Sequence, residues 1–169
     1  MTKTGPRDPG TRASLPGEAR RRDGARRAWA LFFARAVLGL IFLMAGIWKV
    51  FQLTPAGHAH RFFVDPYAGS FLPSWALWTV GVTVPIVELA GGALVLLGWR
   101  TRDASVALGL VLVTVTFGHL VKEPLYAFHE HVFPRLALLL FVLAAPEAWD
   151  RFSVDALLAR KRGREETAG

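Results

Sequence analysis

WALWTVGVTVPIVELAGGALVLLGW, residues Trp75–Trp99, is the stretch that decides the fold, because its 25 positions carry one charged residue, Glu88. At a rise of about 1.5 Å per residue, roughly 20 such residues cover the ~30 Å hydrocarbon core of a bilayer. Glu88 is therefore predicted near the bilayer midplane. An acid costs about 2.5 to 3.5 kcal/mol there on insertion scales, so Glu88 is expected to be paired, protonated or turned toward a polar cavity.

Three more apolar segments accompany this one, at Ala28–Phe51, Ala104–Val121 and Leu136–Ala145. The last is too short to span a bilayer alone, so we expect its helix to begin near Phe128. With 53% hydrophobic residues, the sequence predicts an all-α integral membrane four-helix bundle in contact with the lipid bilayer. We expect residues 28–160 to form this transmembrane domain, residues 1–27 a disordered basic tail, and residues 161–169 a frayed C-terminal tail.

The net charge of +7 is unevenly distributed along the chain. Eight of the 20 Lys and Arg residues precede Trp29, two flank the turn at Arg100–Asp103, and five follow Pro146. The positive-inside rule places this turn and both termini in the cytoplasm, which predicts a multi-pass protein of the plasma membrane. In a soluble chain the same charge would suggest nucleic acid. Here its distribution indicates topology, and no nucleic-acid partner is expected.

The absent residue types narrow the chemistry. The chain has no cysteine, so it forms no disulfide and offers no thiolate to an iron–sulfur cluster. It also lacks the GxSxG, GxxxxGK[ST] and GxGxxG motifs of hydrolases and nucleotide-binding proteins. A redox role would therefore depend on a cofactor or a partner protein.

Arg35, Lys49 and Glu88 are the charges inside the apolar segments and the candidate catalytic residues. Counted from the cytoplasmic end, Glu88 lies about 12 residues deep and Arg35 about 7, while Lys49 is near the outer end, so depth slightly favours Arg35 as the partner of Glu88. Two interpretations stay open. The acid accepts protons beside a quinone or another small amphipathic ligand, or an ion pair fixes helix register without chemistry.

Residues around Glu88 and in the outer half are candidates for contact with a cofactor: Glu88, Gly91, Gly92, His119 and Lys122. The glycine pair also permits close approach of helices in lipid, and Pro85 frees backbone carbonyls one turn before Glu88. A short interfacial amphipathic helix is expected around His58–Phe63.

All five histidines lie in the outer half: His58, His60, His119, His129 and His131. His129 and His131 do not share a helix face, and no HExxH pattern is present, so no metal site is predicted.

Three stretches resemble one family of membrane proteins. They are RAVLGLIFLMAGIWKV at Arg35–Val50, ELAGGALVLLGWRTR at Glu88–Arg102, and DRFSVDALL at Asp150–Leu158. The chain resembles the DoxX-like family of small four-helix bacterial membrane proteins, which includes DoxX and the DoxD-type small subunit of thiosulfate:quinone oxidoreductase. The resemblance implies that the candidate functional positions include Arg35, Lys49 and Glu88, the Thr101–Arg102 turn, and Ser153 and Asp155.

The resemblance also implies a membrane component of quinone-linked or of thiol and sulfur redox systems, working with a partner redox protein. We therefore expect a subunit or accessory of a quinone-linked oxidoreductase, with quinone as the cofactor near Glu88. Two alternatives are a non-catalytic membrane scaffold for a redox complex and a small-solute or proton carrier. A homo-oligomer is compatible with each of these functions.

Overall fold

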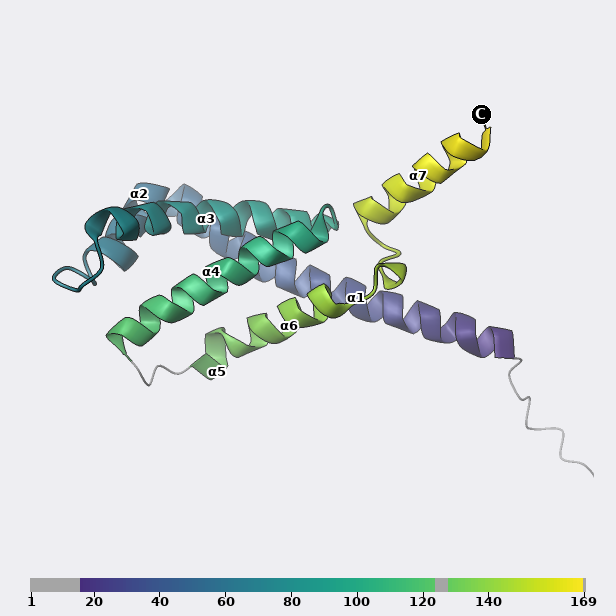
Figure 1. Ribbon diagram of the computed structural model, residues 1–169, viewed down its shortest axis with the longest axis horizontal. Coiled ribbons are helices and arrows are strands. Elements are labelled where there is room, and N and C mark those ends of the chain that lie inside the picture. The colour runs from purple at the N-terminus through teal and green to yellow at the C-terminus, as the bar shows by residue number, and fades with distance from the viewer. Residues whose placement is uncertain (1–15, 124–127, 169) are drawn as a thin grey trace, which may run out of the picture.

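The computed structural model describes residues 16–123 and 128–168. Within these ranges the chain is helical and has no strand, which confirms the all-α class. The elements are α1 (Pro16–Ile47), η1 (Trp48–Gln52), α2 (Pro55–Ala59), η2 (His60–Val64), α3 (Ser74–Leu97), α4 (Thr101–Lys122), α5 (Phe128–His131), α6 (Phe133–Ala144), η3 (Glu147–Trp149) and α7 (Val154–Ala168). Figure 1 shows α1, α3, α4 and α6 running in alternating directions, and α1 and α4 each contact both α3 and α6.

Three helical stretches are long and apolar enough to cross a membrane: Arg20–Gln52, Ser74–Leu97 and Thr101–Lys122. The outward face of α4 shows why lipid suits this bundle. Val106, Leu110, Val113 and Phe117 are 52 to 67% exposed and recur at helical spacing, which makes a continuous apolar stripe. Such a stripe is stable against acyl chains and costly against water, so the chain is a membrane protein.

The predicted fourth span differs from the expectation, because it is divided into α5 and α6 at Val132. Pro134 lies two residues after Val132. A proline ring has no N–H and clashes with the carbonyl four residues earlier, so α5 does not continue into α6 as one regular helix. The 12 residues of α6 extend only about 18 Å. Helicity begins at Phe128, as expected, but the described chain has three helices of spanning length and one shorter apolar helix in place of the predicted four spans.

Both ends of the described chain are more helical than the expected tails. Helix α1 begins at Pro16, a residue favoured in the first turn, so residues 16–27 belong to it, and residues 1–15 lie outside the described range. The Ala, Arg and Glu residues that follow are strong helix formers and extend a helix that the apolar half has already nucleated. Helix α7 reaches Ala168, and the Ser153 hydroxyl caps it by accepting a hydrogen bond from the Ala156 amide.

Glycines bring α1 and α3 into backbone contact. A Cβ added at Gly39 would lie 2.7 Å from the Leu96 nitrogen, and one added at Gly46 or Gly92 would collide with the facing backbone in the same way. Small residues permit this approach, as expected for helices packed in lipid. The contacts also fix the antiparallel register, in which Glu88 lies level with Ile47, and Arg35 lies level with Arg100, beyond the end of α3.

The α1–α3 connection folds back onto the bundle. The helix expected around His58–Phe63 is present as α2 and η2, but it packs against α3, with Ala59 fully buried, instead of resting only on an interface. At the opposite end, the first turns of α1 and the whole of α7 both project from the bundle and diverge from each other (Figure 1). The two basic ends of the described chain therefore lie on one side, as their charges predict, while the membrane face that they occupy stays a prediction.

Candidate functional site

Glu88 forms an ion pair with Lys49. The Lys49 ammonium nitrogen Nζ lies 2.5 Å from Glu88 Oε2, and the two side chains are 20% and 8% exposed. This corrects the slight preference for Arg35 as the partner. Arg35 precedes Lys49 by 14 residues in the sequence, which is about 21 Å along a helix, and the glycine-fixed register places it beyond the last turn of α3.

Lys49 reaches Glu88 from a π-helical turn. Helix α1 widens after Ile47 into η1, where the Leu53 amide donates to the Trp48 carbonyl five residues earlier. Such turns are rare and are found frequently at functional sites. This turn lies level with Glu88, because the glycine contacts hold the end of α1 beside α3. Lys49 on the turn can therefore pair with the buried Glu88 carboxylate.

The second feature of the site is a hydrogen bond between His58 and the backbone of α3, and Pro85 makes it possible. Having no N–H, it leaves the carbonyl of Gly81, four residues earlier, without its helical partner. His58 takes that carbonyl, because its ring nitrogen Nδ1 lies 2.7 Å from the Gly81 oxygen. Gly81 also makes the approach possible, since a Cβ at this position would lie 2.6 Å from the Ala59 Cα. Gly81 and Pro85 together therefore dock α2 onto α3.

The same hydrogen bond fixes the chemistry of His58. A carbonyl oxygen only accepts, so Nδ1 must carry the proton. Burial lowers the pKa of His58 from 6.5, the hydrogen bond to Gly81 opposes the shift, and the Lys49 charge adds to it. The ring is therefore neutral at pH 7, and its other nitrogen, Nε2, is a free proton acceptor.

These groups line one cavity of about 520 Å³, within the roughly 300 to 1,000 Å³ typical of small-molecule sites. Its polar lining comprises Lys49, His58, Tyr67, Glu88, His119 and Arg135. The apolar lining includes Phe42, Trp48, Phe62, Phe63, Val84 and Leu112. An aromatic and aliphatic cavity with a few convergent polar groups suits a flat amphipathic molecule.

The remaining candidate residues lie elsewhere. Gly91 faces the Leu108 side chain and Gly92 the Leu43 backbone, so both serve helix packing and neither lines the cavity. His119 lines it, whereas Lys122 is exposed at the end of α4 and does not. The side chains of His129 and His131 lie outside the described part of the structure. Among the side chains that are described, no three His, Asp or Glu residues are grouped for a metal ion.

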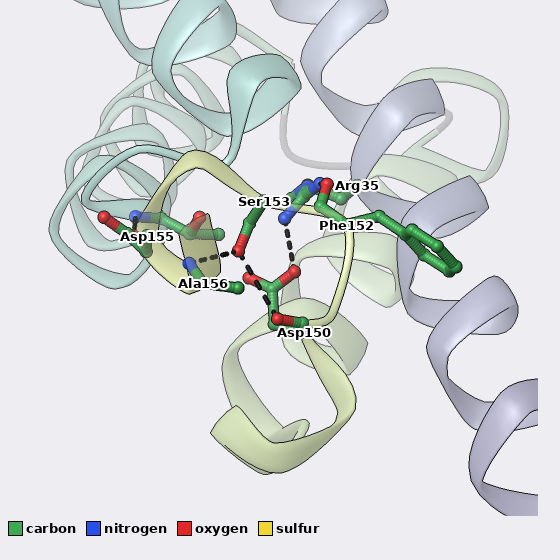
Figure 2. A network of polar contacts seen from close by, with 7 residues as sticks. Arg35, Asp150, Phe152, Ser153, Asp155 and Ala156 are labelled. Carbon is green, nitrogen blue, oxygen red and sulfur yellow. Dashed lines mark hydrogen bonds and ion pairs between the residues drawn. The ribbon is translucent and has the colours of Figure 1, made fainter. Parts of the chain in front are cut away.

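Arg35 anchors a second polar cluster at the other end of the bundle. The side chain is 1% exposed, and its Nη1 lies 2.6 Å from Asp150 Oδ1. Its Nη2 donates to the Phe152 carbonyl at 2.5 Å. Figure 2 shows the guanidinium pointing at the Asp150 carboxylate, with Ser153 following in the same loop and Asp155 in the first turn of α7. Arg35 therefore ties the segment after α6 to the middle of α1.

The turn between α3 and α4 completes this cluster. Gly98 adopts φ +71°, a conformation that side chains disfavour, and a Cβ there would strike the Arg35 guanidinium and Ser153. Its carbonyl accepts from the Asp155 amide at 3.0 Å, while Asp155 Oδ2 accepts from the Thr101 amide at 3.4 Å. We interpret the cluster as a structural lock, because both terminal nitrogens of the Arg35 guanidinium are bonded within it, although its buried Nε has no partner among the described residues.

Sequence reasoning missed two residues. Asp150 was quoted within a motif but not as the partner of Arg35, and His58 was counted only among the outer histidines. One signal for His58 was present, since a proline four residues after Gly81 predicts an unsatisfied carbonyl. Nothing local in the sequence says which donor takes it.

The chain matches a known family of proteins. The model of the DoxX family matches residues 30–120, more than half of the chain. The matched region runs from α1 to α4 and contains Lys49, His58 and Glu88, but it ends before α6 and Asp150. No curated protein and no solved structure matches the chain significantly.

Proposed function

The chain belongs to the DoxX family, and on this premise we propose that it is the membrane subunit or accessory protein of a quinone-linked oxidoreductase. The observation that carries the proposal is the buried Lys49–Glu88 ion pair beside His58 in a cavity of about 520 Å³. The absence of cysteine means that the chain has no dithiol of its own. A partner redox protein would deliver or accept the electrons.

The lining of the cavity fits a quinone. Trp48, Phe62 and Phe63 contribute flat aromatic surface suited to a ring. Lys49 supplies hydrogen-bond donors and His58 Nε2 supplies an acceptor, which match the carbonyl and hydroxyl oxygens of the oxidised and reduced forms. A bound quinone would supply exchange of two electrons and two protons, which no side chain of this chain provides.

Each residue has a defined task in this proposal. Glu88 holds the Lys49 ammonium nitrogen in place at 2.5 Å. Lys49 donates a hydrogen bond to an oxygen of the ligand and stabilises negative charge on it. His58, held by Gly81 with Nδ1 protonated, accepts a proton at Nε2. The apolar walls lower the local dielectric around these groups, which strengthens their electrostatic interactions.

The proposed setting follows from the surface and the charges. The apolar stripe of α4 faces lipid, and the basic ends of α1 and α7 face the cytoplasm of a bacterial cell by the positive-inside rule. A cysteine accessibility scan would test this orientation. Single cysteines at Gly17 and Ala68, both exposed, should be labelled by an impermeant maleimide from opposite sides of the membrane.

The test of the ligand is direct binding. Purified protein in mild detergent is titrated with a short-chain ubiquinone or menaquinone, and tryptophan quenching is followed. The wild type should bind in the micromolar range, and His58→Asn or the double variant Lys49→Met/Glu88→Gln should bind at least about tenfold more weakly, the loss of one good hydrogen bond. The control is His60→Asn, because His60 is exposed and rests on Trp78 outside the cavity.

Wild-type protein that neither retains nor binds quinone would overturn the proposal. If the cavity variants still copurify a partner redox protein at wild-type levels after losing quinone binding, partner assembly does not depend on the cavity. If the wild type itself binds no quinone yet holds such a partner, the scaffold function replaces the one proposed here.

A further inference from the structure

A cleft of about 500 Å³ lies between the first turns of α1 and the connection from α6 to α7. It brings together three guanidinium groups from distant parts of the sequence, those of Arg20, Arg27 and Arg151, with one carboxylate, Asp23. Two positive charges are therefore in excess within the cleft. This cleft is separate from the proposed quinone cavity and shares no lining residue with it.

The pairing of these arginines differs from that of their neighbours. Around the same end of the bundle, Arg35 pairs with Asp150, Arg100 with Asp103 and Arg102 with Glu147. Over residues 16–123 and 128–168, by contrast, no carboxylate forms an ion pair with any of the three arginines of the cleft. Their N–H groups thus remain available for an anion from outside the chain.

The packing around the cleft holds these side chains in position. The Arg27 guanidinium lies over the Trp149 ring, 5.3 Å from its centroid, an arrangement that leaves the N–H edge of the group free. Gly24 gives Arg151 room to lie against α1, because a Cβ at position 24 would be 3.1 Å from Arg151 Nη2. An interaction with an aromatic ring and a gap in the helix surface thus orient two of the three arginines.

Exposed aromatic side chains follow two of the cleft arginines along the sequence. Trp29 follows Arg27 by two residues and Phe152 follows Arg151 directly, and the Trp29 and Phe152 rings are tilted against each other with centroids 4.7 Å apart. Trp29, Phe33 and Phe152 are 48%, 59% and 45% exposed. A free inorganic anion would not contact this aromatic surface. A lipid combines a charged headgroup with apolar chains and could contact both the arginines and the aromatic rings.

We propose that this cleft binds the phosphate headgroup of an anionic phospholipid, with the acyl chains lying over Trp29, Phe33 and Phe152. The planar guanidinium forks of arginine match phosphate oxygens in bidentate geometry. Tryptophan is favoured at the headgroup level of a membrane, and basic pockets between membrane helices bind anionic headgroups. The net excess of positive charge selects an anionic lipid over a zwitterionic one.

The test uses the full-length protein, stripped of lipid in mild detergent and titrated with phosphatidylglycerol or phosphatidylcholine, with bound lipid counted by native mass spectrometry. The wild type should prefer phosphatidylglycerol by at least about tenfold. The variant Arg20→Gln/Arg27→Gln/Arg151→Gln should lose the preference. The control Arg21→Gln/Arg22→Gln/Arg61→Gln loses the same charge outside the cleft, and Arg61 also lies over an aromatic ring, Phe62; it should retain the preference.

A second variant keeps every charge. Gly24→Leu fills the space beside Arg151 and replaces a poor helix former by a good one, so the fold is retained while phosphatidylglycerol binding falls. Equal loss of preference in the cleft variant and the control variant would overturn the proposal, since unspecific charge would then explain binding. Displacement of phosphatidylglycerol by equimolar inorganic phosphate would also overturn it, because the site would then recognise a free anion.

Discussion

Replacing Lys49 by methionine removes the cation that lies 2.5 Å from Glu88 and leaves a carboxylate whose side chain is 8% exposed. Exposed ion pairs contribute about 0 to 1 kcal/mol, and breaking a fully buried pair costs about 3 to 5 kcal/mol. Lys49 is 20% exposed, so some solvent screening remains. We therefore expect Lys49→Met to lower the free energy of unfolding by about 2 to 4 kcal/mol.

The double variant Lys49→Met/Glu88→Gln should be more stable than Lys49→Met alone, because no unpaired charge is then buried. Contacting residues couple by about 0.5 to 3 kcal/mol in such cycles, and this pair should fall in the upper half of that range. Unfolding is followed by far-UV circular dichroism as a denaturing detergent is titrated into mixed micelles. The control is Lys161→Met, since Lys161 lies 4.0 Å from Glu165 and both are largely exposed; it should change stability by less than about 0.5 kcal/mol.

Strict additivity of the two single variants would refute the reasoning, because it would mean that the two charges do not interact. A Lys49→Met protein as stable as the wild type would refute it as well, since the acid would then be neutral or solvated without its partner. Either result would also remove the electrostatic basis of the proposed ligand site.

Three further predictions concern packing, the second cluster and pH. Gly46→Ala forces a Cβ into the Leu89 backbone and should cost about 2 to 3 kcal/mol, whereas Gly109→Ala, where the nearest atom is 3.5 Å away, should be neutral or stabilising in a thermal melt. Arg35→Met leaves Asp150 unpaired and should destabilise the fold by about 3 kcal/mol, and trypsin should then cleave between α6 and α7 sooner than in the wild type. The pKa of His58 is lowered from 6.5, so the unfolded chain binds the proton first. The free energy of unfolding should therefore be fully retained above pH 6.5 and should fall below it, and His58→Asn should flatten this part of the melting-temperature profile.

The helices were largely predictable because their causes are local. The run at Trp75–Trp99 predicts a spanning helix, and α3 occupies Ser74–Leu97. Close helix packing at the glycines was also predictable, since small residues in apolar helices let backbones approach in lipid. The break that Pro134 introduces into the fourth apolar helix was not predicted. The helical extension of α1 back to Pro16 was missed because composition favours disorder in a basic tail, whereas attachment to a long stable helix favours continued helix.

The partner of Glu88 was not predictable from depth alone. Counting residues from the membrane surface treats each helix as an ideal rod that ends at the same level. The real register depends on which backbones touch, and Gly46 against Leu89 sets it. The register of α1 against α3 decides whether Arg35 or Lys49 lies near Glu88. That register is seen only once the two helices are packed.

By itself the sequence determined that this chain is helical, that it enters a membrane and that Glu88 lies within a spanning helix. These properties follow from the order of polar and apolar residues along single helices. Only the tertiary structure decided that Glu88 pairs with Lys49, that His58 takes the carbonyl released by Pro85, and that Arg35 holds Asp150, 115 positions away. Such contacts join side chains whose separation along the chain is large, and the packing of whole helices, not any local pattern, brings them together.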